Sequence, residues 1–490
     1  MIALVVVTAL LPLAGPAALL FRIGPRGAGY AIAGGGVAAL AGAIVVAVHV
    51  ESTGPLSALS GFIYVDPLSA FFLITVAAVV ALAGFGSAAY LEREDRTGEL
   101  GRLQIGLYVT FFAVFATMML ASCATGNLGL LWVLIEASTL ASAVLVALEA
   151  RATSLEAAWK YIIISSFGVT IALVGTLFLY YAATSLPLSP NQRLTWPALH
   201  AHAGALERDS LRLSFLLAVI GYGTKVGLAP MHTWLPDAHS EAPSPASAML
   251  SAALLNTGMY AIIRFQSIAG VELGRYTNRV LLVFGFASIA VGALFMVGRD
   301  NFKRLFAYSS VEHMGIIAVA LGFGGPLGMY GALLHTLNHA VGKAVLFLTG
   351  GELYSSYRTR NARDLGGVIS SAPLVGGVLL LASLAILGSP PFGLFLSEFT
   401  IVRAGIAGSS AWLVGLLLVL LVLAFVAFLA TTARIALGEP TGRVSVRAEA
   451  TSSVVGAVPL VAGLAVLLVL GMWIPGGLSD LIRHSVGTIR

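Results

Sequence analysis

The stretch GYGTKVGLAPMHTWLPDAH, residues 221–239, decides the fold because it combines two features that a lipid bilayer disfavours. Lys225 lies late in an apolar run long enough to span a membrane, and Gly227 and Pro230 interrupt the helix directly afterwards. Burying an ammonium group in lipid is costly, and an interrupted helix leaves backbone groups without partners. Both features are tolerated where water reaches the break, so the stretch predicts a hydrated path inside a membrane protein.

The composition indicates an all-α polytopic membrane protein. Of the 490 residues, 58% are hydrophobic and 10% are charged, whereas a soluble domain carries about 25% charged residues. The apolar runs are continuous over about 20 residues and do not alternate as the strands of a membrane barrel do. The net charge of +5 is scattered over short loops, which predicts no nucleic-acid partner.

The single cysteine, Cys123, limits the redox chemistry of the chain. One thiol cannot form an internal disulfide, an iron–sulfur site or a four-cysteine zinc site. Because Cys123 lies in an apolar stretch, we expect a small buried residue there. Any redox centre is therefore expected in a partner protein.

Fourteen apolar segments predict about fourteen transmembrane helices. The twelfth is too long for one crossing and contains GSPPFG, which predicts a second broken helix. Loops after odd segments carry about fifteen Lys and Arg and loops after even segments about seven, which places both termini on the periplasmic side of the cytoplasmic membrane. The segments lie near 2–21, 29–50, 67–90, 104–124, 127–148, 159–182, 213–232, 245–266, 279–297, 304–322, 326–352, 372–405, 411–436 and 453–475.

The two predicted breaks, KVGLAPMHTW and GSPPFGLFLSEF, lie five segments apart. An odd offset inverts a repeat relative to the membrane, so we predict inverted five-helix repeats whose broken helices meet water near the bilayer midplane. This divides the chain into supporting helices (1–103), a first repeat (104–266), a second repeat (279–436) and a C-terminal helix and tail (437–490).

Ionisable residues inside the predicted helices are few, and an intramembrane ionisable group usually marks an ion or proton pathway. His335, His339 and Lys343 are spaced i, i+4 and i+8, which places them on one helical face about 6 Å apart. Waters can pass a proton between groups at that spacing, although plain hydrogen-bonded core histidines stay an alternative. The other candidates are Glu136, Lys225 and Glu398, with accessory candidates Lys160, His232, Asp237, His239, Glu312 and His313.

Glu136 is the natural partner of Lys225, because a carboxylate that approaches or withdraws would make a buried lysine hold or release its proton. A static buried ion pair is the alternative. His335 and His339 could also supply two metal ligands, but a third His or carboxylate would be needed and the next ionisable group on that helix is a lysine. We therefore expect no metal site.

Residues near the predicted helix ends have simpler interpretations. Asp237, His239 and Glu241 form either the mouth of a path or a solvated loop. Arg264, Lys303 and Arg304 are expected to contact lipid headgroups, because long basic side chains extend to the membrane surface.

Three long motifs carry a family resemblance: KVGLAPMHTWLPDAHSEAPSPASAMLSAALL, FKRLFAYSSVEHMGI and HTLNHAVGKAVLFLTGG. Through them the chain resembles the antiporter-like subunits of respiratory complex I and of Mrp cation/proton antiporters, over nearly its whole length and most strongly from about 127 to 400. SSVEHMGI and EASTLASAVLV are most similar to the large antiporter-like membrane subunit of group 4 energy-converting nickel–iron hydrogenases, including formate hydrogenlyase-type complexes.

The resemblance implies fourteen helices, an inverted five-helix repeat and proton translocation along a central hydrophilic axis. It gives Glu136 the role of modulating Lys225 and makes Glu398 the exit residue, with His335, His339 and Lys343 as the connecting relay. Asn256 stands where a lysine or histidine is common in the family. Asn cannot hold a proton at neutral pH, so either His313 or extra water bridges this point or pumping is weak here.

The resemblance also implies a function and a set of partners. We expect a non-catalytic, proton-translocating membrane subunit of a complex I-like, group 4 hydrogenase-linked oxidoreductase. A Ni-Fe centre, iron-sulfur clusters or quinone are expected only in partner subunits, which comprise other membrane subunits and a peripheral redox arm; lipid is a further contact. The alternatives are an Mrp-type exchanger moving Na⁺ as well as protons, a subunit of an inorganic-carbon uptake complex, and a structural subunit that has lost pumping.

Overall fold

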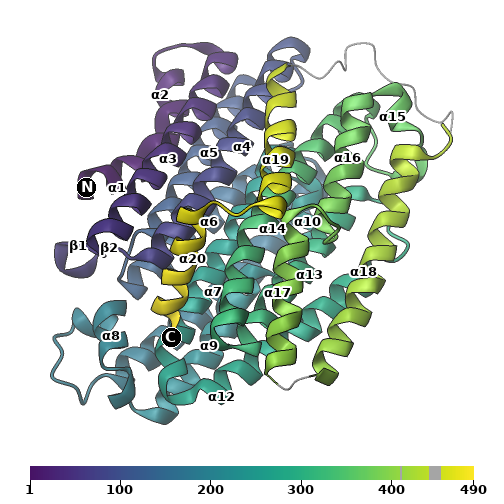
Figure 1. The fold of residues 1–490 in the computed structure, drawn as a ribbon. Helices are drawn as coiled ribbons and strands as arrows, with labels where there is room; N and C mark the ends of the chain where they lie inside the picture. Colours follow the sequence, from purple (N-terminus) through teal and green to yellow (C-terminus); the bar gives the residue numbers. More distant parts are fainter. Residues whose placement is uncertain (409–410, 441–453) are drawn as a thin grey trace.

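The computed structural model describes residues 1–408, 411–440 and 454–490, and they form a bundle of long helices (Figure 1). Ten helical stretches in the described part are long and apolar enough to cross a membrane. The predicted all-α membrane fold is therefore confirmed.

The N-terminal part comprises α1 (Ile2–Leu10), a 3-10 turn (Leu11–Leu13), α2 (Ala14–Leu20), α3 (Gly24–Thr53), α4 (Pro67–Thr97) and α5 (Arg102–Cys123).

The central part of the chain contains the helices that carry most of the candidate residues. These are α6 (Leu128–Val146), α7 (Ala152–Ala182), α8 (Trp196–Ala201), α9 (Arg208–Val226), α10 (Trp234–Glu241), α11 (Ser244–Met249), a π-helical turn (Leu250–Leu254), α12 (Leu255–Met296), α13 (Phe302–Phe323) and α14 (Gly325–Tyr357). The C-terminal part comprises α15 (Val368–Ser371), α16 (Pro373–Ile386), α17 (Gly393–Ala407), α18 (Ala411–Leu437), α19 (Val454–Met472) and α20 (Gly476–Ile489).

Each of the fourteen predicted apolar segments overlaps helix in the structure. Two of them, 245–266 and 279–297, are joined in one helical stretch from α11 to α12, with a kink at Leu273 (φ −119°, ψ 26°). Because length and composition identify ten spanning stretches, the number of fourteen crossings stays a prediction, as do the repeat boundaries.

Both predicted breaks are present, and each contains a glycine in the left-handed region. Gly227 has φ +80° and ends α9, after which helix resumes at α10. Gly388 has φ +65° and lies between α16 and α17. A side chain with a Cβ adopts this conformation only at a cost, so glycine allows the chain to leave each helix abruptly.

Polar side chains define several helix starts. Asp66 accepts a hydrogen bond from the backbone N–H of Ser69 at the start of α4, where Pro67 occupies the first position. Asn127 caps α6 and Asn301 caps α13 in the same way. These caps satisfy N–H groups that a helix cannot pair internally. Ahead of α4 lies a small antiparallel hairpin, β1 (Leu56–Ala58) and β2 (Ile63–Val65), which the sequence did not predict.

The helices differ greatly in how far their neighbours cover them. The most apolar stretch of α13 is 94% buried, whereas that of α18 is 22% buried and that of α19 is 33% buried. In Figure 1, α13 and α14 lie in the interior, between the N-terminal helices and α18. The interior helices therefore offer the place where polar groups can be shielded from lipid. Cys123 is buried, as expected.

Candidate functional site

Lys225 lies in the last turn of α9, two residues before the break, and its side chain is fully buried. Its ammonium group donates a hydrogen bond to the Tyr161 hydroxyl (2.9 Å) and another to Thr139 Oγ1. The Tyr161 ring lies 4.7 Å from the Lys225 nitrogen, within the range of a cation–π interaction. The Trp234 ring lies 6.0 Å from the same nitrogen, so two neutral hydroxyls and two aromatic faces solvate this charge.

Glu136 does not pair directly with Lys225. Among the described residues no ion pair of 4 Å or less joins the two, and the Thr139 hydroxyl stands between them. Thr139 Oγ1 accepts from Lys225 and lies 3.4 Å from Glu136 Oε2, while the Ser166 hydroxyl donates to Glu136 Oε1 at 2.5 Å. Lys225 and Glu136 are therefore connected through one hydroxyl, that of Thr139, and not by a direct ion pair.

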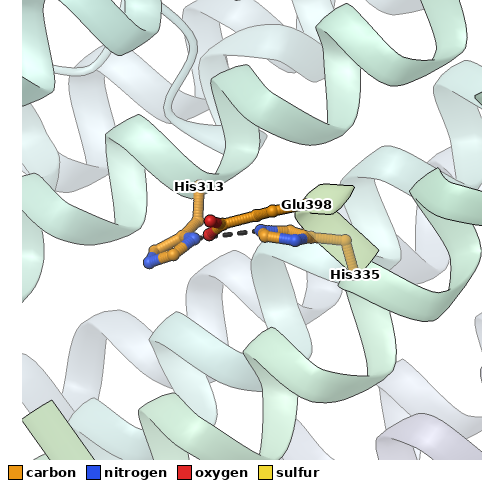
Figure 2. Close-up of side chains that lie close together, drawn as sticks. All are labelled: His313, His335 and Glu398. Carbon is orange, nitrogen blue, oxygen red and sulfur yellow. Dashed lines mark hydrogen bonds between the residues drawn. The ribbon is translucent and has the colours of Figure 1, made fainter. Parts of the chain in front are cut away.

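The second group of candidate residues surrounds His335 on α14 (Figure 2). His335 Nε2 lies 3.0 Å from Nδ1 of His313 on α13, and its Nδ1 lies 2.9 Å from the hydroxyl of Ser397 on α17. Glu398, also on α17, directs its carboxylate towards the two rings. One ligand atom from each of His313, His335 and Glu398 lies within 4.8 Å of the other two.

His339 and Lys343 extend this group along α14, as their spacing predicted. The His339 ring centroid lies 5.3 Å from that of His313, and neither His339 nitrogen has a hydrogen-bond partner in the described structure. Lys343 is fully buried and donates to the Phe306 carbonyl of α13 at 3.0 Å. Glu312 is buried beside His313, with its Oε2 3.6 Å from His313 Nε2.

Asn256 lies in the first turn of α12, directly after the π-helical turn. Its amide nitrogen donates to the Ala252 carbonyl (2.6 Å) and reaches the Thr336 carbonyl of α14 (3.5 Å), next to His335. Its Oδ1 is buried and has no protein partner in the described structure. A π-helical turn is often found at functional sites. Asn256 therefore contacts the helix that carries the histidines and keeps one acceptor free for water.

The remaining accessory candidates occupy two different environments. Lys160 is 47% exposed and pairs with Glu156 (2.7 Å) and with Asp237 (3.2 Å), so both Lys160 and Asp237 belong to a surface ion-pair network. His232 is almost wholly buried, with aromatic rings about it at 6.4 to 6.5 Å. His239 is fully buried, stacks on Phe347 with a centroid distance of 5.0 Å, and has both ring nitrogens without a partner in the described structure.

Arg264 and Lys303 differ from their expected positions at the lipid headgroups. The Arg264 and Asp66 side chains are each 2% exposed and form two hydrogen bonds of 2.7 and 2.6 Å. Lys303 is 2% exposed and donates to the Ala242 carbonyl at 2.9 Å. It lines a cavity of about 230 Å³ whose wall also carries Glu352 and Arg360. Each side chain finds a polar partner inside the protein, so neither needs to reach the membrane surface.

Several functional groups were missed from the sequence because they are neutral. Thr139, Tyr161, Ser166 and Ser397 complete the hydrogen bonds of the ionisable residues, yet none of them is a conspicuous residue in an apolar helix. The only available signal was the clustering of hydroxyl residues in EASTLAS (136–142) and IIISS (162–166). Without a structure, that clustering has no specific interpretation.

A membrane bundle with two broken helices and buried lysine, histidine and glutamate side chains in its interior is typical of an ion-translocating membrane subunit. The family follows from the sequence match: the chain belongs to the NADH:quinone oxidoreductase/Mrp antiporter transmembrane family, whose model matches residues 125–424. It is an antiporter-like membrane subunit of the class found in complex I-like and hydrogenase-type complexes.

One curated relative is the hydrogenase-4 component F homologue of Methylacidiphilum infernorum, which is 37% identical over 383 residues, 78% of this chain and 80% of the relative. Two solved structures share the fold. The archaeal membrane-bound sulfane sulfur reductase has a chain with a TM-score of 0.85 and 23% identity, covering 100% of this chain and 98% of that one. The Mrp complex of Dietzia sp. DQ12-45-1b contains a chain with a TM-score of 0.82 and 20% identity, covering 99% of this chain and 96% of that one.

Proposed function

We propose that this chain translocates protons as a membrane subunit of a complex I-like, group 4 hydrogenase-linked oxidoreductase. The observation that carries the proposal is the arrangement of buried proton-binding groups across the interior of the bundle. Lys225 and Glu136 are linked through Thr139, and His313, His335 and Glu398 gather where α13, α14 and α17 meet. Intramembrane ionisable groups arranged in this way serve proton movement far more often than stability.

The environment of Lys225 suits a group that takes up and gives up a proton. Its partners are hydroxyls, which can accept a hydrogen bond from the ammonium form and donate one to the neutral amine. A direct carboxylate partner would instead hold the proton in place. Thr139 connects Lys225 to Glu136 without fixing the charge, so a change at Glu136 can influence Lys225 through one hydroxyl.

Beyond Lys225, Asn256 orients water rather than carrying a proton. Its unpaired Oδ1 accepts a hydrogen bond from water, and its amide contacts α14 beside His335. The proton then enters the histidine group, where His313 and His335 already share a hydrogen bond. Glu398, which is less buried than either histidine, is the exit.

The hydrogenase link rests on the relative named as a hydrogenase-4 component F homologue, at 37% identity. In the proposed complex, a peripheral arm holds the Ni-Fe centre and the iron-sulfur clusters, and other membrane subunits contact this chain. Redox chemistry in the arm drives charge through the membrane, where one elementary charge moved against 100 mV requires about 2.3 kcal/mol. The complex lies in the cytoplasmic membrane, with both termini of this chain on the periplasmic side.

The composition of the native complex tests this proposal. The chain is purified in mild detergent with its bound partners, and the subunits and metals are identified together by mass spectrometry and elemental analysis. Nickel and iron with cysteine-rich partners are the expected result. Iron without nickel would replace the hydrogenase link by another redox partner. Small hydrophobic partners without metal would overturn the redox coupling and favour a cation/proton exchanger, and zinc in a large soluble partner would favour carbon uptake.

A further inference from the structure

We propose that His313, His335 and Glu398 form a binding site for a zinc-like divalent metal ion, and that the bound ion blocks the proton path. The metal site stands on the geometry alone, whereas the block rests on the proposed function.

The three residues come from three different helices and meet at one point. His313 lies on α13, His335 on α14 and Glu398 on α17, with one ligand atom of each within 4.8 Å of the others. Figure 2 shows the two imidazole rings facing each other with the carboxylate beside them. From the sequence, His335 and His339 of one helix lacked a third ligand, whereas helix packing brings His313 of α13 and Glu398 of α17 to His335.

The distances are close to those of a metal site. His313 Nδ1 and His335 Nε2 are 3.0 Å apart. Two nitrogens bound to one tetrahedral Zn²⁺ at about 2.0–2.1 Å lie roughly 3.3–3.4 Å apart, so the rings would separate by only a few tenths of an ångström. Two histidines and one glutamate are a known zinc donor set that leaves a fourth position for water. Ca²⁺ and Mg²⁺ prefer more oxygen ligands than this site offers.

The outer nitrogen of His335 has a partner that would orient it towards a metal, because its Nδ1 lies 2.9 Å from the Ser397 hydroxyl. The outer nitrogen of His313, Nε2, lies 3.6 Å from a Glu312 oxygen, which is longer than a hydrogen bond, and has no hydrogen-bond partner in the described structure. Metal-binding histidines commonly donate their other N–H to a hydrogen-bond partner, which fixes the tautomer and the ring. With the metal in place, each neutral histidine carries its single proton on this outer nitrogen, and the shared hydrogen bond between the two rings is gone.

The cluster can be reached through the broken segment between α16 and α17. Glu398 is partly exposed, whereas His313 and His335 are at most 1% exposed. Its carboxylate packs against the α-carbon of Gly388, where an added Cβ would lie 2.1 Å from Oε2. Pro390 and Pro391 in the same segment are exposed. The carboxylate is therefore the ligand that meets an entering ion first.

The lone pairs that would bind the metal are the ones that a relay needs for protons. Metal binding requires neutral imidazole and ionised carboxylate. An ion held by His313, His335 and Glu398 removes all three from proton transfer, so its occupation stops flux through the second half of the chain.

The test uses the full chain, purified in mild detergent and titrated with Zn²⁺ alone. We expect about one Zn²⁺ per chain bound at this site, with X-ray absorption showing nitrogen and oxygen donors, two histidines among them. His335→Gln and Glu398→Gln should weaken binding by at least about 100-fold, and Ser397→Ala by about tenfold. His484→Gln is the matched control, because His484 forms a His–carboxylate pair with Glu51 (2.6 Å) that is 61% exposed at the histidine.

Ser397→Ala keeps the test decisive if a ligand variant fails to fold, because it removes one hydroxyl beside His335 and keeps all three metal ligands. Binding that is equal in wild type and in all three variants overturns the site, as does a loss of binding in His484→Gln alone. Proton flux is then measured in reconstituted vesicles over a range of Zn²⁺ concentrations, for each protein relative to its own flux without Zn²⁺. A half-inhibiting Zn²⁺ concentration that is about tenfold higher in Ser397→Ala than in wild type supports the block. Zn²⁺ bound with flux unchanged overturns the block and leaves the metal site standing, and absence of flux without Zn²⁺ refutes the proposed function instead.

Discussion

The hydroxyl of Thr139 contacts both Lys225 and Glu136, so Thr139→Val tests the connection most simply. Valine keeps the shape of threonine and removes the hydroxyl. Lys225 then loses one of its two hydrogen-bond partners and keeps the Tyr161 hydroxyl at 2.9 Å. A hydrogen bond to a charged group contributes about 1.5–3 kcal/mol. If that amount is lost from the transfer step, proton flux falls about 10- to 150-fold, since about 1.4 kcal/mol corresponds to a factor of ten.

The assay measures proton entry into vesicles that contain the complex purified with this chain, driven by an imposed membrane potential. Thr349→Val is the matched control, because Thr349 is equally buried and its hydroxyl donates only to the Val345 carbonyl of its own helix at 2.7 Å. Both variants should assemble as the wild type does. A Thr139→Val flux within twofold of wild type would refute the idea that this hydroxyl links the two ionisable residues.

Three further predictions concern stability and the second break. Asp66→Asn leaves Arg264 buried without its counter-charge and should destabilise the protein by about 3–5 kcal/mol; an unchanged thermal unfolding temperature in detergent would contradict this. Glu207 caps α9, and hydrogen bonds from a serine side chain and the backbone N–H groups of the first turn lower the pKa of its carboxyl. The stability that this cap contributes is therefore fully present above the unfolded pKa of about 4.3 and is lost as the pH falls through the lower folded pKa. The destabilisation caused by Glu207→Ala at pH 6 should therefore shrink at pH 3. An equal loss of stability at both pH values would count against the cap. Gly388→Ala places a Cβ at a φ of +65° and 2.1 Å from Glu398 Oε2. It should cost about 1–3 kcal/mol of stability and displace the Glu398 carboxylate, which would be measured as reduced proton flux. Flux and stability equal to those of the wild type would refute this prediction.

The two breaks could be predicted because their cause is local. Glycine and proline within an apolar run interrupt a helix whatever surrounds it, and KVGLAP and GSPPFG contain both residue types. The alignment of His335, His339 and Lys343 was predictable for the same reason, because helical periodicity alone places them on one face.

The contacts between helices could not be predicted from one sequence. Asp66 and Arg264 are 198 residues apart, and nothing local identifies either as the partner of the other. Close helix packing decides such contacts: a Cβ on Gly292 would lie 2.7 Å from the Glu312 Cβ, so α12 and α13 approach closely beside the histidine group. The meeting of His313 with Glu398 depends on how three helices pack, which spacing along one of them does not contain.

The hairpin and the π-helical turn were missed for another reason. The strands β1 and β2 are three residues each, too short for an alternating pattern to be recognised. The π-helical turn at Leu250–Leu254 lies within a run whose composition is that of an ordinary apolar helix. It becomes informative only once Asn256 is seen to follow it.

The central claim is that Lys225 takes up and releases a proton, and the most direct measurement is proton flux in Lys225→Met and Lys225→Arg within the assembled complex. Methionine removes the charge at nearly the same length, and arginine keeps a charge that it does not give up. The account predicts that both variants assemble and that both lose flux. Flux retained in Lys225→Arg would contradict it, because a fixed positive charge at this position would then be sufficient.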